Sequence, residues 1–264
     1  MQGRIGLGRL AVASKGFRFY SGFHPHSPIS FQVADQMTDR LLISPKAYRP
    51  PKIHRRVVLF FNLEHFFRFR ELTDGSKIQP FGPSKRFNFG TGAESATAIG
   101  GLIGAPLAAL AVEQACAWQS KRFFSLGTAG WIGEREVEPG SCFSPFWGID
   151  RTGIAAEYGM KEERFRCDPL YELPSCGGIV SVNGFFSLSV SKVIGFRRQG
   201  IDLIDMETAS LFLLARLRKS SFHPLLVVGD AVSQSFEWAD GSGLKSFERG
   251  MQIGMELLLK KMSE

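Results

Sequence analysis

Three carboxylates in the second half of the chain stand where such side chains can meet a ligand. Asp205 and Glu207 precede an apolar helical segment, and Asp230 follows the apolar run 224–228. Acids at the start of a helix fit its macrodipole, which is a purely structural explanation for the first two. An aspartate after a buried strand usually caps a loop, but the carboxyl ends of strands in α/β sheets also bind ligands. These three residues are therefore candidates for a ligand site.

The stretch Ser125–Ile132, with the sequence SLGTAGWI, is the next candidate. An apolar run ends there in a small, glycine-flanked turn, which predicts a buried strand whose carboxyl end opens into a crevice. Gly127 and Gly130 would let backbone N–H groups approach a ligand closely. Upstream, residues 103–106 predict a second glycine turn that opens a helix. Glycine turns between strands and helices are common in α/β proteins, so this pattern does not establish a site by itself.

The composition is typical of one large globular domain. The chain has 264 residues, 44% of them hydrophobic, which is enough to bury a sizeable core. No apolar run approaches the ~18–20 residues of a membrane span. The four cysteines show neither CxxC nor zinc-finger spacing, so we expect a reduced, cytoplasmic environment and no structural metal; they are Cys116, Cys142, Cys167 and Cys176.

The net charge of +7 could indicate an anionic ligand or nucleic acid, but its location argues against the latter. Residues 1–34 contain Lys and Arg and no acid, and the first carboxylate is Asp35. This acid-poor leader resembles an organellar transit peptide. An over-extended translation start and a loose basic arm are the alternatives. We predict a leader over residues 1–56 outside the fold, one domain over residues 57–264, and no nucleic-acid or membrane partner.

Alternating strands and helices along the rest of the chain predict an α/β layered domain. We expect a buried strand at 57–61, then a helix or loop through Leu72, then a β-ribbon within 87–103. A strand at 177–183 and a closing helix at 243–262 complete the pattern. That helix carries an apolar stripe for the core: Leu244, Phe247, Met251, Met255, Leu258 and Leu259.

Four motifs occur in an order and spacing that is specific when they are taken together. They are IGAP at 103–106 with AVE at 111–113, GTAG at 127–130, DMETA at 205–209, and GD at 229–230. This set resembles the nucleoside phosphorylase family, in the branch of uridine phosphorylase, bacterial-type purine nucleoside phosphorylase and methylthioadenosine/adenosylhomocysteine nucleosidase. The resemblance covers residues ~57–260. It implies a three-layer α/β/α sandwich with a central mixed, partly barrel-like sheet, and a homo-oligomer, a dimer or larger.

The same resemblance implies the groups that would bind a nucleoside. Glu207 corresponds to the glutamate that binds the ribose hydroxyls, with Met206 packing on the sugar and Asp205 beside them. A carboxylate suits this task because it accepts two hydroxyl hydrogen bonds and lies near the positive charge that develops on the sugar. Phe185 corresponds to the aromatic residue that stacks on the base, and Phe186 follows it.

Asp230 matches the aspartate that, in purine-specific members of the family, protonates the imidazole nitrogen of the leaving base. A general acid needs a raised pKa, and burial against the apolar run 224–228 would raise it. Uridine-specific members instead carry a glutamine and an arginine at the places of Ser189 and Ser191. Because two serines cannot make the hydrogen bonds of that glutamine and arginine, the resemblance favours a purine nucleoside.

Two departures concern the nucleophile site, which we expect around Ser125, Gly127 and Thr128. Phosphorylases of the family carry an arginine where this chain has Ser125, and a phosphate loop where it has residues 61–65. Losing both arginines removes the bidentate grip on phosphate. Nucleosidases of the family, which use water, lack these arginines too, so hydrolysis is favoured over phosphorolysis.

Nucleosidases also have a glutamate near the first loop that activates water, and Glu64 or His65 lies close to that place. The predicted activity is hydrolytic cleavage of the N-glycosidic bond of a purine nucleoside, in nucleoside catabolism or nucleotide salvage. A phosphate-dependent purine or uridine phosphorylase is one alternative, and a non-catalytic nucleoside- or protein-binding relative is another. We expect no metal and no organic cofactor; phosphate would be a co-substrate only for a phosphorylase. The location is predicted to be cytoplasmic, with organellar targeting left open by the leader.

Overall fold

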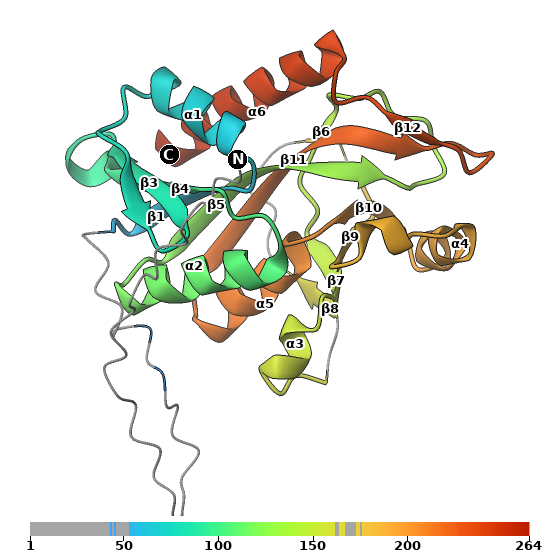
Figure 1. The fold of residues 1–264 in the computed structure, drawn as a ribbon, viewed down its shortest axis with the longest axis horizontal. Coiled ribbons are helices and arrows are strands. Elements are labelled where there is room, and N and C mark those ends of the chain that lie inside the picture. Colours follow the sequence, from blue (N-terminus) through green and yellow to red (C-terminus); the bar gives the residue numbers. More distant parts are fainter. Residues whose placement is uncertain are drawn as a thin grey trace, which may run out of the picture. The chain divides into compact units, whose positions relative to one another are not determined.

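The structure is a computed structural model of the chain and describes residues 43, 45, 53–161, 164–166, 173–174 and 176–263. Most of the predicted leader, residues 1–56, therefore lies outside the described residues, and so does Cys167. From Arg56 onward the chain folds around one mixed β-sheet (Figure 1). The α/β layered fold predicted from the sequence is confirmed.

The long strand β5 (Arg122–Trp131) lies at the centre of this sheet. One edge of β5 pairs with β1 (Arg56–Phe60) and then with β10 (Ile201–Asp205), while β11 (Ser221–Val232) follows the other edge along its whole length. The remaining strands are β2 (Gln79–Phe81), β3 (Ser84–Phe89), β4 (Ala96–Gly100), β6 (Cys142–Phe143), β7 (Trp147–Arg151), β8 (Arg164–Arg166), β9 (Gly178–Val182) and β12 (Trp238–Asp240). The order of the described strands does not close into a ring.

Helices cover both faces of the sheet, which gives three layers (Figure 1). On one face lie α2 (Ala105–Ala117) and α5 (Thr208–Leu217), and on the other lie α1 (Leu63–Leu72) and α6 (Lys245–Ser263). Two further helices, α3 (Ile154–Glu157) and α4 (Val190–Arg198), lie toward the edge that contains β7 and β9.

The strand β1 shows why its sequence is apolar at nearly every position. Val57 and Leu59 join the core beneath α2 and α5, while Val58 and Phe60 join the core beneath α1 and α6. Successive side chains of a strand point to opposite faces, so a strand covered on both sides needs a continuous apolar run. The closing helix buries most of the predicted stripe in the same way, but Leu259 is only partly buried, and Leu244 precedes the helix and is half-exposed.

Two predicted strand ends are wrong. The stretch 125–132 does not form a turn, because β5 continues to Trp131 with Gly130 and Trp131 paired to both neighbouring strands. Likewise the strand that was predicted to end in Gly229 and Asp230 continues to Val232 as β11, with a register shift between Val228 and Asp230 that marks a bulge. Glycine and small polar residues indicate a turn only when they have no strand partners, and such partners cannot be seen locally in the sequence.

The described helices include none that is long and apolar enough to cross a membrane. Within the described ranges, no group of three or more His, Cys, Asp or Glu side chains is arranged to hold a metal ion. The three described cysteines, Cys116, Cys142 and Cys176, are free thiols.

Candidate active site

The candidate site lies where β5 changes its neighbour. The register with β1 ends at Phe60 opposite Leu126, and the register with β10 occupies Gly130 and Trp131. The two strands run in opposite directions along this edge of β5, so their carboxyl ends face each other across residues 127–129. None of the described strands pairs with those residues on this edge. Their backbone polar groups are therefore left for other partners.

A cavity of about 240 Å³ occupies this gap. Its lining brings together residues from distant parts of the chain: Phe61, Asn62, His65, Ile103, Gly127, Thr128, Ala129, Gly130, Phe185, Ile204, Asp205, Met206, Glu207 and Asp230. A second, outer cavity of about 460 Å³ adjoins it and shares Asn62, His65, Thr128, Phe185 and Asp230. Most of the predicted site residues thus meet in one place.

The two glycines of the GTAG motif are required by close packing. A Cβ on Gly127 would lie 2.7 Å from the Phe61 ring, and one on Gly130 would lie 2.9 Å from the Trp238 ring. The glycines were predicted to let a ligand approach the backbone. In the structure, their lack of a side chain leaves room for the rings of Phe61 and Trp238. Thr128 between them is exposed to the cavity, while Ala129 is buried.

Glu207 is buried at the ribose end predicted for the site, with 5% of its surface exposed. Its Oε1 atom accepts a hydrogen bond of 2.5 Å from the N–H of Gly104, the residue that precedes α2. Burial and the neighbouring Asp205 carboxylate raise the pKa of Glu207 to about 8. Glu207 occupies the N-cap position of α5 but makes no side-chain cap hydrogen bond to that helix, so capping α5 does not explain this carboxylate.

Asp205 supplies the cap instead. Its Oδ2 atom accepts a hydrogen bond of 2.9 Å from the N–H of Thr208, and its Oδ1 atom accepts one of 2.5 Å from the Ser181 hydroxyl. Burial raises the pKa of Asp205. Asp205 lines the cavity, but both of its oxygens hold the start of α5 and the neighbouring strand β9 in place.

Asp230 also lines the cavity, in the bulged part of β11 on the other edge of β5 from β10, and is half-buried. Burial, followed by the Asp240 carboxyl group with which it shares a hydrogen bond, raises the pKa of Asp230 to about 6. The following loop is held by its own serines: Ser233 and Ser235 share a hydrogen bond, and Ser233 accepts another from the N–H of Glu237. The contacts of Asp230 are thus directed to Asp240 and the cavity.

The start of α1 forms a third wall. The Asn62 side chain caps the helix by accepting a hydrogen bond of 2.7 Å from the N–H of Glu64. His65 is buried beside the Phe247 ring and lines both cavities, and desolvation lowers its pKa. The Glu64 side chain is exposed and lines only the outer cavity.

The aromatic wall differs in part from the prediction. Phe185 lines both cavities and meets Trp238 edge to face, with 5.3 Å between the ring centroids. The Phe186 side chain is fully exposed and lines neither cavity. Trp238 was missed by the sequence analysis. It lies in a short exposed strand whose pairing with β11 has no local signal except the polar residues 233–235 before it.

Ser125 does not line either cavity. It is fully buried in β5, and its hydroxyl has no hydrogen-bond partner among the described residues. The position therefore contributes no group to the described cavity.

The charge of the lining is uniformly acidic. Its carboxylates are Glu64, Asp205, Glu207, Asp230, Asp240 and Glu248, and the described lining of both cavities contains no Lys or Arg. An arrangement of this kind favours hydroxyl groups and developing positive charge, and it opposes anions.

The comparisons with known proteins concern the fold and one region of the sequence. Residues 174–258 match the sequence profile of the phosphorylase superfamily. Over that region, which contains the motifs at 205–209 and 229–230, the chain therefore has the sequence pattern of this superfamily, in agreement with the resemblance inferred from the motifs. No curated protein sequence matches the chain significantly.

Three solved structures illustrate the range of similar proteins. Uridine phosphorylase from Vibrio fischeri in complex with 6-hydroxy-1-naphthoic acid has a TM-score of 0.67 and 17% identity, covering 84% of this chain and 94% of that one. Purine nucleoside phosphorylase from Toxoplasma gondii in complex with immucillin-H has a TM-score of 0.64 and 15% identity, covering 80% and 90%. A futalosine hydrolase mutant of Helicobacter pylori has a TM-score of 0.65 and 13% identity, covering 79% and 98%. At these identities they show a shared fold.

The burial of Glu207 predicts a pH-dependent effect on stability. Its pKa of about 8 in the folded protein exceeds the ordinary value of 4.5, so the stability it contributes is complete below pH 4.5 and is lost as the pH rises through 8. Glu207→Gln removes the charge and keeps an acceptor for the Gly104 N–H. We expect it to raise the free energy of unfolding by about 1–3 kcal/mol at pH 9 and to have little effect at pH 4.

Urea unfolding at both pH values measures this difference. Glu71→Gln, at an exposed position on α1, is the matched control and should change stability at neither pH. Equal stability of Glu207→Gln and the wild-type protein at pH 9 would contradict the desolvated state of the carboxyl group.

Proposed function

We propose that this protein hydrolyses the N-glycosidic bond of a purine nucleoside. The observation that carries the proposal is the acidic lining, with three carboxyl groups (Asp205, Glu207 and Asp230) and no Lys or Arg among the described residues of the inner cavity. A phosphate nucleophile would meet the carboxylates without an Arg or Lys to hold it. A water nucleophile is uncharged, so the carboxylates do not repel it and it needs no Arg or Lys.

Glu207 is the group that would hold the sugar. Its carboxyl group is positioned by the Gly104 N–H at the start of α2, and Met206 lies beside it in the cavity wall. In the free protein the pKa of about 8 keeps most of the Glu207 carboxyl groups protonated at pH 7. In this proposal the ribose hydroxyls donate hydrogen bonds to the ionised form and so favour it, and this carboxylate then lies near the positive charge that develops on the ribose as the bond breaks. Removing a preorganised group of this kind costs about 10²–10³-fold in rate.

Phe185 and Asp230 would hold the base. The Phe185 ring provides an apolar face in the cavity wall, and Asp230 provides a carboxyl group whose pKa of about 6 keeps part of the population protonated at neutral pH. As the bond between the sugar carbon and the base nitrogen breaks, the electron pair goes to the base. The Asp230 proton passes to the imidazole nitrogen of the purine.

His65 is better placed than Glu64 to activate the water. Its imidazole is buried, lines the inner cavity and has a lowered pKa, so it is neutral at pH 7 and can accept a proton. The water oxygen bonds to the sugar carbon while His65 takes the water proton. The products are the free purine and ribose, and the proton on His65 balances the one that Asp230 has given to the base.

The remaining expectations stay predictions. Ile103 lines the inner cavity and exposes 66% of its surface, so a neighbouring subunit of the expected homo-oligomer would cover an apolar residue here. The absence of an organic cofactor or metal, the cytoplasmic location and the lack of a nucleic-acid partner remain predictions from the sequence.

A nucleoside panel tests the proposed reaction. Phosphate-free protein is incubated with adenosine, inosine and uridine, with and without added phosphate, and the free base is measured by chromatography. We expect purine release that does not depend on phosphate and no release of uracil. Glu207→Gln, which should be about 10²–10³-fold slower, controls for a contaminating enzyme. Strict phosphate dependence with ribose 1-phosphate as the product would contradict hydrolysis, and binding without any cleavage would favour a non-catalytic relative.

The pH profile tests Asp230 as the general acid. Because the Asp240 carboxyl group helps to raise the pKa of Asp230, Asp240→Asn should lower that pKa. The rate near pH 5 should stay close to wild type, while the alkaline fall in kcat/KM should begin at lower pH. Glu237→Gln, an exposed change in the adjacent loop, should leave the profile unchanged.

Asp230→Asn itself should lower the rate on inosine about 10²–10⁴-fold, because the leaving base then lacks a proton donor. The loss should be much smaller for 4-nitrophenyl riboside, whose leaving group needs no proton. Equal, slight losses on both substrates would remove Asp230 from the mechanism.

A further inference from the structure

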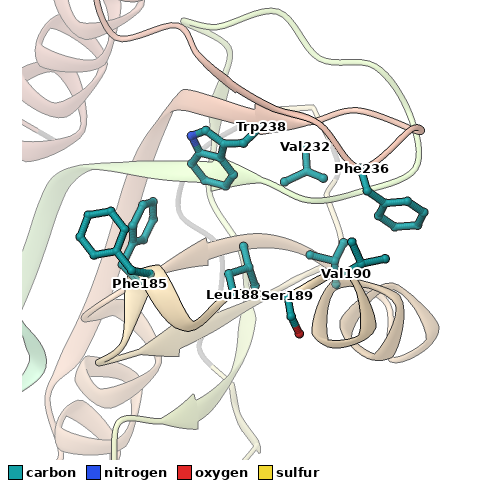
Figure 2. A pocket seen from close by; sticks show the side chains of 9 residues that line it. Phe185, Leu188, Ser189, Val190, Val232, Phe236 and Trp238 are labelled. Atoms are coloured by element: carbon teal, nitrogen blue, oxygen red, sulfur yellow. The ribbon is translucent and has the colours of Figure 1, made fainter.

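An apolar chamber of about 310 Å³ adjoins the candidate active site (Figure 2). It extends from Phe185 at one end to Phe236 at the other, with Trp238 on one side and Leu188 and Ser189 on the opposite side. Val193 and Val232, which expose 3% and 8% of their surfaces, also line it. The proposed chemistry uses none of this space beyond Phe185.

The far wall of the chamber is held in place by Arg197 on α4. Its Nε atom donates a hydrogen bond of 2.6 Å to the Ile132 carbonyl, and its guanidinium also donates to the carbonyls of Val232 and Ser233. The same guanidinium lies 5.0 Å from the centroid of the Phe236 ring. The chamber is thus a supported feature of the fold and not a gap between loose side chains.

Only side chains separate the chamber from the active-site cavities. Phe185 lines the inner cavity, the outer cavity and the chamber, and Trp238 lines both the outer cavity and the chamber. The two rings meet edge to face in a contact that side-chain rotation can open. A ligand held between Glu207 and Asp230 would therefore reach the chamber past these rings.

The size and chemistry of the chamber select one kind of group. A closed apolar cavity of about 150 Å³ is large enough to bind benzene, so this chamber has room for one aryl ring. Ser189 is the only polar residue in the described lining; the rest is apolar or aromatic. Such a lining stabilises an uncharged apolar group and disfavours a charged or strongly hydrated one.

The position of the chamber indicates which part of the ligand would enter it. Trp238 lies in β12, the strand that pairs Asp240 with Asp230, so the chamber adjoins the base end of the site. The exocyclic group on the six-membered ring of a purine lies on the same edge as the imidazole nitrogen that Asp230 would protonate. A substituent on that exocyclic group therefore points past Asp230 toward Trp238.

We propose that the chamber binds an apolar, aryl-sized substituent on the exocyclic nitrogen of the purine base. This inference rests on the proposed function, and it makes Trp238, Val190 and Phe236 specificity-determining residues of that site. A second copy of the chain could cover the chamber instead. The concave shape, the buried floor and the side chains shared with the active site favour a ligand.

Adenosine and N6-benzyladenosine are the probes. Dissociation constants are measured by calorimetry and kcat/KM by release of the free base. We expect N6-benzyladenosine to bind about tenfold more tightly than adenosine, equivalent to about 1.4 kcal/mol, which is near the lower end expected for burying an aryl side chain. Equal or weaker binding of the benzyl compound by the wild-type protein would overturn the proposal.

Val190→Trp places a large side chain in the chamber from the exposed start of α4, where it should be tolerated. It should abolish the preference for the benzyl group and leave adenosine unchanged. Ile253→Trp, at a similarly exposed position on α6, is the matched control and should keep the preference. Phe236→Ala, which removes the far wall, should weaken the preference without filling the space. A preference that survives both chamber variants would overturn the proposal.

The two proposals can fail separately. Cleavage of adenosine without any benzyl preference would leave the proposed function standing and overturn the chamber. A benzyl preference in binding that Val190→Trp abolishes, without cleavage of either compound, would support the chamber and overturn the proposed function. Analytical ultracentrifugation tests whether a second copy covers the chamber. Dissociation of an oligomer by Val190→Trp but not by Ile253→Trp would show that it does, and would overturn the proposal that the chamber binds a substituent of the base.

Discussion

The change of neighbour along β5 is the constraint on which the rest of the site depends. One edge of this strand pairs first with parallel β1 and then with antiparallel β10, and the two registers leave residues 127–129 without a strand partner on that edge. The carboxyl end of β1 leads to Asn62 and His65, and that of β10 leads to Met206 and Glu207. The mixed sheet therefore leaves the gap that forms the cavity, and the two strands that end at this gap lead into the residues that line it. On the opposite edge of β5, the pairing with β11 is continuous.

The buried carboxyl groups show how this site departs from what stability alone would favour. Asp205 has hydrogen bonds to both oxygens, so its burial is compensated by the contacts that hold α5 and β9. Glu207 lies beside it, and its raised pKa shows that the ionised form is disfavoured in the fold. Two neighbouring buried carboxyl groups are a poor solution for a structural core. They are reasonable in a site where ribose hydroxyls and a developing positive charge interact with one of them.

The sequence predicts the fold better than it predicts the details of the site. Continuous apolar runs identify β1 and β11, and the four ordered motifs locate Glu207 and Asp230 in one cavity because that order reflects the topology. The turn at 125–132 was wrong because glycine serves close packing against Phe61 and Trp238 there. Trp238 was missed because its short strand has no local signal. Phe186 lies outside the two cavities that Phe185 lines, because adjacent phenylalanines differ only in the direction of their side chains, and it lines the apolar chamber instead. The sequence could not decide whether Glu64 or His65 is the water-activating residue. In the structure, helix α1 directs His65 into the inner cavity, while Glu64 lines only the outer cavity.

The pairing of Glu207 with the ribose hydroxyls is the central claim, and a double-mutant cycle tests it most directly. Calorimetric dissociation constants for inosine and 2′,3′-dideoxyinosine are compared in Asp230→Asn protein, which should consume inosine about 10²–10⁴-fold more slowly, with and without Glu207→Gln. At pH 9, where Glu207 with its pKa of about 8 is mostly ionised, the account predicts a coupling energy of about 1.5–3 kcal/mol, the range for hydrogen bonds to a charged group. Dideoxyinosine should bind equally well with Glu or Gln at position 207. Additive losses, with no coupling between the hydroxyls and Glu207, would contradict the account.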